Sequence, residues 1–139
     1  MAMVNKYFFT SESVTEGHPD KICDQLSDAI YDEMLKQDPD SHAGIECFYT
    51  TGLVLVGGEA RTKAYIDIQE TVRSALKKIG YDKPEYGFCA DDVGVIVTLH
   101  EQSLDIAQGV DYVVADNEIV KKEQGAGDQC LMFGYATDE

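Results

Sequence analysis

The residues with the most evident chemistry lie together in the segment EGHPDK, residues 16–21, directly before an amphipathic stretch. Pro19 suits the first position of a helix, where its missing N–H costs nothing, and it keeps His18 out of helical geometry. The N–H groups at a helix N-terminus attract anions. A histidine there could donate a hydrogen bond to a phosphate oxygen, and Asp20 could hold Mg²⁺, which takes oxygen ligands and usually bridges phosphates. This interpretation makes the segment a phosphate site.

A structural interpretation also fits the local pattern. His18 would cap the helix, Asp20 would complement the helix dipole, and Lys21 would be solvated. Hydrolysis by a His18–Asp20 pair is disfavoured, because the intervening proline splays the two side chains and no nucleophile is placed nearby. The local pattern alone leaves the phosphate site and the helix cap as alternatives.

Two predicted helices would position this segment. From Pro19 onward, apolar residues recur at four-residue spacing, which predicts a helix that ends before Pro39. They are Ile22, Leu26, Ile30 and Met34. Residues 65–82 predict a second helix with one apolar face and with Gly80 as its C-terminal stop. That face comprises Ile68, Val72, Leu76 and Ile79.

Three segments are typical of β-structure. Residues 5–14 combine aromatic and hydroxyl side chains, which predicts a strand that runs into a loop. Residues 43–60 are rich in β-branched and aromatic residues, with a bend near Thr51–Gly52 and a stop at Gly57–Gly58. Residues 92–103 contain a short apolar run that predicts a buried strand. Strands mixed with helices predict an α+β fold, with a β-sheet layer covered by helices.

The last third of the chain has a weaker pattern. Residues 102–124 form a polar stretch with glycine-rich borders, which predicts a mobile loop. The chain then reads GAGDQCLMFGYATDE, a glycine turn and a strand-like run without a terminating pattern. We therefore expect residues 1–139 to be one part of a larger protein.

The composition limits the classes of partner. The chain has 11 Lys plus Arg and 26 Asp plus Glu, a formal charge of −15. Nucleic acids and anionic membranes both require a basic surface, so neither is expected as a partner. A phosphate ligand would need metal ions or basic groups from elsewhere. The four cysteines have no metal-site spacing, and no segment is typical of a signal peptide or membrane span, so we expect a cytoplasmic protein with reduced thiols.

Several motifs together resemble one family. The stretches FTSESVTEGHPDKICDQLSDA, TTGLVLVGGE, IGYD, EQSLDIAQGVD and GAGDQCLMFGYATDE are similar, in this order, to S-adenosylmethionine synthetases. The resemblance covers nearly the whole chain and implies the N-terminal part of a fold with three related subdomains, the later ones being absent. It also implies a methionine adenosyltransferase. In that reaction the methionine sulfur attacks C5′ of ATP, and the leaving triphosphate is cleaved to phosphate and pyrophosphate.

The resemblance assigns roles around the phosphates. His18 would contact the triphosphate near the bond that breaks, Asp20 would bind magnesium, and Glu12 would be a further acid of the phosphate–metal region. Asp128 is expected near the nucleotide, with a turn residue as the simpler interpretation. The family has glycine at the position of Cys130, and a side chain at positive φ would cost about 1–2 kcal/mol. Cys130 could therefore disturb Asp128.

The resemblance also assigns roles around methionine. Glu46, an acid within an apolar strand, would help to hold K⁺, whereas the pattern alone fits an edge-strand glutamate that faces water. Glu59 would meet the methionine ammonium group, or would be an ordinary turn acid. Gln102 would contact methionine, or would be a surface amide, and residues 102–112 would form a lid that excludes water.

The resemblance implies homodimers or tetramers with active sites between subunits, and lysines and an arginine that come from later subdomains. We therefore expect the isolated chain to lack full activity. One alternative is a non-catalytic module that pairs with a full-length synthetase through exposed apolar faces. A weaker one is a stand-alone nucleotide- or metal-binding domain.

Overall fold

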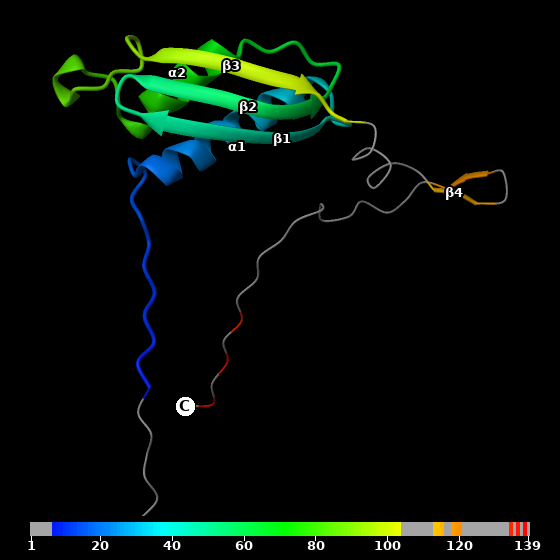
Figure 1. Ribbon diagram of the computed structural model, residues 1–139, viewed down its shortest axis with the longest axis horizontal. Coiled ribbons are helices and arrows are strands. Elements are labelled where there is room, and N and C mark those ends of the chain that lie inside the picture. Colours follow the sequence, from blue (N-terminus) through cyan, green and yellow to red (C-terminus); the bar gives the residue numbers. More distant parts are fainter. Residues whose placement is uncertain are drawn as a thin grey trace, which may run out of the picture. The chain divides into compact units, whose positions relative to one another are not determined.

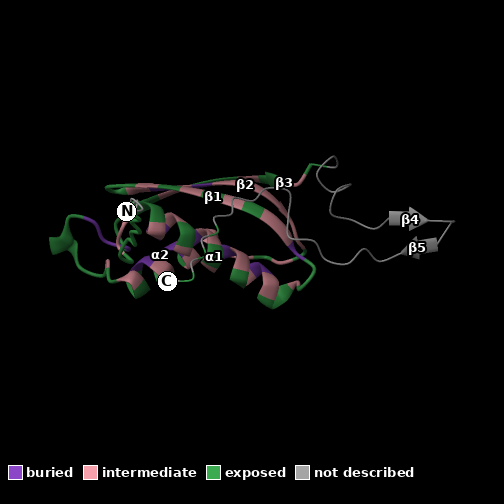
Figure 2. Cartoon of the chain, turned by 90° about the horizontal axis from the view of Figure 1, so that it is seen from below, coloured by how far each residue is buried: buried purple, intermediate pink, exposed green. Residues whose placement is uncertain are grey.

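Two helices cover one face of a three-stranded sheet in the computed structural model of the protein (Figure 1). The structure describes residues 7–103, the backbone of residues 113–115 and 118–120, and residues 134, 136 and 138. The chain divides into two units, Met1–His100 and Glu101–Glu139. Figure 2 shows the first unit from the side, with the sheet as one layer and the helices as the other. The predicted α+β class, a sheet layer covered by helices, is confirmed.

Helix α1 spans Pro19–Gln37, as the four-residue spacing of apolar side chains predicts. All four of these side chains are buried, namely Ile22, Leu26, Ile30 and Met34. The helix ends where the N–H of Asp38 donates to the carbonyl of Met34, because the following proline cannot extend it. Burial of this stripe against the sheet fixes the direction in which the N-terminus of the helix projects.

Helix α2 spans Ile68–Ile79 and is also as predicted. The carboxylate of Asp67 caps its N-terminus by accepting from the N–H of Glu70. Gly80 ends the helix in the left-handed conformation, with φ 113°. Val72 and Leu76 from this helix join the core with Val54 and Val56 of the sheet.

The sheet has the order β1-β2-β3. Strands β1 (His42–Thr50) and β2 (Leu53–Arg61) are antiparallel, and their tight turn contains Gly52 with φ 79°. Strand β3 (Gly94–Glu101) follows α2 and the 3₁₀ turn Pro84–Tyr86. Gly94 lies beside Gly52 and Thr98 lies beside Gly57, so residue numbers rise together along β2 and β3. Strands β2 and β3 are therefore parallel, and their C-terminal ends lie at the same end of the sheet.

The predicted strand stop at Gly57–Gly58 is wrong, because β2 continues through both glycines to Arg61. Gly58 has φ 116°, and a Cβ added there would lie 2.0 Å from the carbonyl oxygen of Gly44. The glycine thus lets β1 pass close to β2 where any side chain would block the ladder.

Two further strand predictions differ from the structure. Residues 7–15 have no regular secondary structure, and the side chains of Tyr7 and Phe8 are 86% and 98% exposed. None of residues 7–15 is part of a strand, although their composition favours one. Strand β3 forms as predicted, but it is an edge strand and Ile96 is half-exposed, so the expectation of a buried strand is wrong.

The second unit contains β4 (Val113–Ala115) and β5 (Glu118–Val120), which pair antiparallel. They fall inside residues 102–124, whose predicted mobility stays a prediction. The strand-like run near the end of the chain, with Asp128 and Cys130, lies outside the described residues. Within the described part of the chain, we find no helix that combines the length and the apolar character needed to span a membrane.

Candidate functional site

His18 occupies the N-cap of α1 and uses one ring nitrogen for that purpose. Its backbone is extended, with φ −65° and ψ 137°, and its Nδ1 accepts a hydrogen bond from the N–H of Asp20 at 3.1 Å. A backbone N–H can only donate, so Nδ1 carries no proton and the neutral ring carries its proton on Nε2. The cap therefore fixes the tautomer and leaves Nε2–H as a donor. The structural and the chemical interpretations of His18 are thus compatible with each other.

Asp20 is exposed in the first turn of α1. Its carboxylate has no hydrogen bond or ion pair with any other described residue, whereas the neighbouring Lys21 is paired with Asp24 at 3.2 Å. The negative charges of Asp20 and Asp24 also raise the pKa of Cys23, although burial of this thiol is the larger cause. This end of the helix therefore offers an available oxygen ligand but little positive charge.

The loop before His18 is held from three directions. The His18 N–H donates to the carbonyl of Thr15 at 3.0 Å. The side-chain amide of Gln25 donates to the carbonyl of Glu16 at 2.9 Å, and the hydroxyl of Tyr81 donates to the carbonyl of Gly17 at 3.2 Å. Tyr81 was not a candidate in the sequence. The available signal was that it directly follows the glycine that ends the second helix.

Glu46 and Glu59 lie on the face of the sheet that points away from the helices. Glu46 is opposite Gly57 and Glu59 is opposite Gly44, so each acid faces a residue without a side chain. The two are diagonal neighbours, about 7–8 Å apart in such a ladder. Glu46 is exposed on an edge strand and Glu59 is half-buried. The alternative of an edge glutamate that faces water therefore fits Glu46 in this chain.

Gln102 and Glu12 have contrasting surroundings. Gln102 directly follows β3, and its side-chain oxygen is buried without a hydrogen-bond partner in the described part of the chain. Buried polar atoms normally have a partner, so this amide has capacity for one more contact. Glu12 is exposed in the irregular segment of residues 7–15. Asp128 lies outside the described residues.

The predicted residues do not form one cluster within the first unit. His18 and Asp20 lie near the end of the sheet that carries the β1–β2 turn. Tyr81 shows this position, because it contacts Gly17, the residue before His18, and is also a neighbour of Tyr49 near the end of β1. Glu59 lies near the other end of β2, six residues beyond Leu53 and thus about 20 Å along the strand. Figure 1 shows α1 beneath the sheet, running between these two ends.

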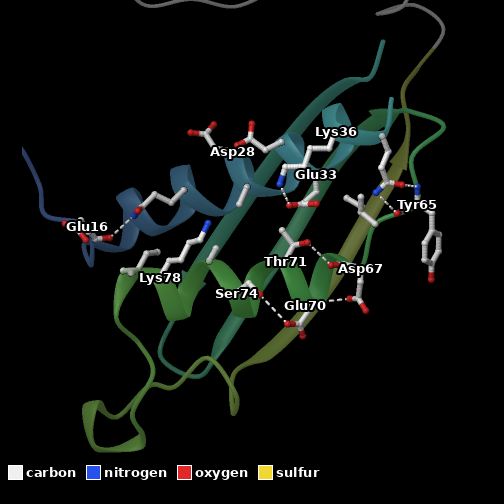
Figure 3. Close-up of a pocket in the computed structure, with 17 residues that line it drawn as sticks. Glu16, Asp28, Glu33, Lys36, Tyr65, Asp67, Glu70, Thr71, Ser74 and Lys78 are labelled. Carbon is white, nitrogen blue, oxygen red and sulfur yellow. Dashed lines mark hydrogen bonds and ion pairs between the residues drawn. The ribbon is translucent and has the colours of Figure 1, made fainter. Parts of the chain in front are cut away.

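A groove lies between α1 and α2 and does not contain the predicted site (Figure 3). None of the candidate residues lines it. Six acids face it against two lysines: Glu16, Asp28, Asp32, Glu33, Asp67 and Glu70 against Lys36 and Lys78. Such a lining repels polyphosphates, so this groove is not a triphosphate site.

The described residues contain no group of three or more His, Cys, Asp or Glu side chains placed to hold a metal ion. Asp20 alone still fits Mg²⁺, which commonly binds through one or two carboxylates and completes its shell with water and phosphate oxygens. Glu46 could likewise supply one oxygen to K⁺. Both ions would then depend on ligands that the described part of this chain does not provide.

A family model described as the N-terminal domain of S-adenosylmethionine synthetase matches residues 6–104. An S-adenosylmethionine synthase of Porphyromonas gingivalis is 53% identical over 133 residues, which cover 96% of this chain and 30% of that protein. An S-adenosylmethionine synthase of Staphylococcus epidermidis is 52% identical over 139 residues, covering 97% of this chain and 35% of that protein. The chain thus spans about a third of the length of these relatives.

Proposed function

Because the chain belongs to the S-adenosylmethionine synthetase family, we propose that it carries part of the active site of a methionine adenosyltransferase. The reaction joins ATP and L-methionine to form S-adenosylmethionine and releases phosphate and pyrophosphate. The observation that carries this proposal is the N-terminus of α1, where His18 keeps a ring N–H available and Asp20 keeps an available carboxylate.

In the proposed reaction, His18 stabilises the leaving triphosphate. Its Nε2–H donates to a phosphate oxygen near the C5′–O bond that breaks, where negative charge develops as the methionine sulfur attacks. The hydrogen bond from the Asp20 N–H to Nδ1 keeps the ring oriented during this step. Asp20, with Glu12 as a further acid nearby in sequence, would hold Mg²⁺, which supplies charge neutralisation for the phosphate oxygens when bound.

The methionine half of the site would come from the far end of the sheet. Glu59 would accept from the ammonium group, Gln102 would use its unpartnered side-chain oxygen, and Glu46 would help to hold K⁺. Since Glu59 lies about 20 Å from the β1–β2 turn along β2, His18 of one copy would act with Glu59 of another. This separation supports a homodimer or tetramer with active sites between subunits.

Several cations in the described part of the chain already have partners. Lys21 is paired with Asp24, and Lys77 with Asp91 at 2.8 Å. Arg73 donates to the backbone carbonyls of residues 90, 91 and 93. We therefore propose that the remaining positive charge comes from outside these residues, and that the isolated chain does not complete the reaction at an ordinary enzymatic rate.

One observation favours a second function, that of an interaction module for a full-length synthetase. The outer face of the sheet exposes apolar side chains, with Phe48 58% and Ile96 50% exposed. Faces of this kind mark association surfaces. Co-expression with an intact synthetase followed by sizing separates the two functions, because a module co-elutes with the synthetase without adding activity.

The test of the catalytic proposal uses a fused enzyme, in which residues 1–139 are joined to the part of the S. epidermidis synthase that follows its matching region. We expect His18→Ala to lower kcat by about 10²–10³-fold, the usual effect of removing one donor to a developing charge. The readout is the rate at which S-adenosylmethionine forms from ATP and methionine. Unchanged kcat in His18→Ala would contradict the proposal.

A further inference from the structure

Within residues 7–103, the loop that carries His18 has one hydrogen bond to a residue far away in the sequence. The hydroxyl of Tyr81 donates to the carbonyl of Gly17 at 3.2 Å, across 64 residues of chain. The other hydrogen bonds described for this loop are local, such as Thr15 with His18 and Glu16 with Gln25. The Tyr81 hydroxyl therefore connects the start of α1 to the segment that follows α2.

Tyr81 is itself fixed without help from the loop. Its N–H donates to the carbonyl of Leu76 at 3.0 Å, and its carbonyl accepts from the N–H of Ala90 at 2.9 Å. Its ring packs edge-to-face on Phe88, with centroids 5.0 Å apart, and Phe88 packs in the same way on Tyr49 at 4.9 Å. The hydroxyl is thus presented to Gly17 by a rigid aromatic cluster.

Tyr49 completes the cluster around Tyr81. Burial, followed by the nearby Tyr81, raises the pKa of Tyr49. The hydroxyl of Tyr81 donates to the carbonyl of Gly17, so the cluster ends at the loop.

Tyr81 approaches Gly17 closely enough that a side chain there would be crowded. A Cβ built on Gly17 would lie 3.1 Å from the hydroxyl oxygen of Tyr81, closer than ordinary van der Waals contact. Glycine at this position thus allows the hydroxyl to reach the backbone one residue before His18. Any shift of the Gly17 carbonyl also turns the peptide that leads into the His18 ring.

We propose that Tyr81 is a positioning residue that sets the orientation of His18 through the carbonyl of Gly17. The inference rests on the proposed role of His18. Ring packing on Phe88 would serve the fold without the hydroxyl, so the hydroxyl is the part that acts on the loop. Tyr81 touches neither substrate nor metal in this account.

The experiment compares Tyr81→Phe with Tyr31→Phe in the full chain. The two hydroxyls are matched, because that of Tyr31 also donates to a backbone carbonyl, that of Ser41 at 3.0 Å, near the opposite end of α1. NMR of the ¹⁵N-labelled imidazole reports the tautomer of His18, and amide hydrogen exchange reports the N–H of Asp20. We expect Tyr81→Phe to speed exchange at Asp20 by about fivefold, the range of one net hydrogen bond, and to shift the His18 ring signals toward a mixture of tautomers.

Tyr31→Phe should leave both His18 signals and Asp20 exchange unchanged, although it removes an equivalent bond. The fused enzyme gives the second readout, where Tyr81→Phe should lower kcat several-fold with little change in the KM for methionine. The positioning role is overturned if Tyr81→Phe leaves the His18 ring and Asp20 exchange as in the parent chain, or if Tyr31→Phe changes them equally. Retained kcat in His18→Ala contradicts the proposed function instead, so the two failures are distinguishable.

Discussion

The two ends of helix α1 differ in what their polar groups do. At the C-terminal end, the carboxylate of Asp38 accepts from the N–H of Lys63 at 2.8 Å and from the N–H of Asp40 at 3.3 Å. At the N-terminal end, the carboxylate of Asp20 has no such partner among the described residues. One helix thus ends in an acid used by the fold and begins with an acid left available for a ligand.

A second pair of polar side chains, Gln37 and His18, shows the same contrast. Gln37 makes two bonds with Tyr65, donating to its carbonyl at 3.0 Å and accepting from its N–H at 3.3 Å. At the other end, His18 uses only Nδ1 in the cap. The comparison shows that residue type does not distinguish structural from functional polar groups. What distinguishes them is the hydrogen-bonding capacity that is still unused after folding.

The largest effect is expected when the carboxylate at one end of α1 is replaced by an amide and the result is compared with the same replacement at the other end. In the fused enzyme, Asp20→Asn should reduce Mg²⁺-dependent activity by at least tenfold, because an amide is a poor ligand for this hard cation. Asp38→Asn should keep the activity per folded molecule and lower the thermal midpoint. The measurements are rate against Mg²⁺ concentration and thermal unfolding for each variant. A reduced Mg²⁺-dependent rate in Asp38→Asn, or an unchanged one in Asp20→Asn, would contradict the distinction between a structural and a ligand-binding carboxylate.

A smaller effect is expected from pH. Hydrogen bonds, first that from the Lys63 N–H, hold the pKa of Asp38 below its usual value of 3.8. An acid whose pKa is lower in the folded state stabilises the fold above its unfolded pKa, and this contribution disappears as the pH falls through the folded pKa. The difference in thermal midpoint between the parent chain and Asp38→Asn should therefore be constant at pH 5–7 and shrink below about pH 4.

The Asp38→Asn comparison isolates one group in a chain with many acids, because all the others titrate in both proteins. Circular dichroism at a series of pH values gives the two midpoints. A difference that stays constant down to pH 3 would mean that Asp38 does not have the lowered pKa that its hydrogen bonds imply.

The sequence predicted what local periodicity controls. The spacing from Ile22 to Met34 placed α1, and Gly80 placed the end of α2, because burial of one helix face and a left-handed cap are both local requirements. The segment EGHPDK was also located at the start of the helix. The tautomer of His18 was not foreseen, since it depends on which nitrogen meets the N–H of Asp20.

Pairing between distant segments could not be read from the pattern. The pattern predicts a strand end at Gly57 and Gly58, whereas the structure continues β2 through both residues, where Gly44 approaches closely. The contact of Tyr81 with Gly17 spans 64 residues and depends on how α2 packs beside α1. The sequence also does not show that His18 and Glu59 lie at opposite ends of the sheet, because it contains the order of residues and not the end of the sheet at which they lie.

The central claim is that the N-terminus of α1 binds a triphosphate through the Nε2–H of His18 with magnesium held by Asp20. The most direct measurement is an NMR titration of the ¹⁵N-labelled chain with tripolyphosphate and Mg²⁺, observed at the His18 ring and at the amides of residues 18–22. The account predicts a saturable shift of Nε2–H that disappears without Mg²⁺ and in Asp20→Asn. An Nε2–H signal that stays unmoved at saturating magnesium and tripolyphosphate would contradict it.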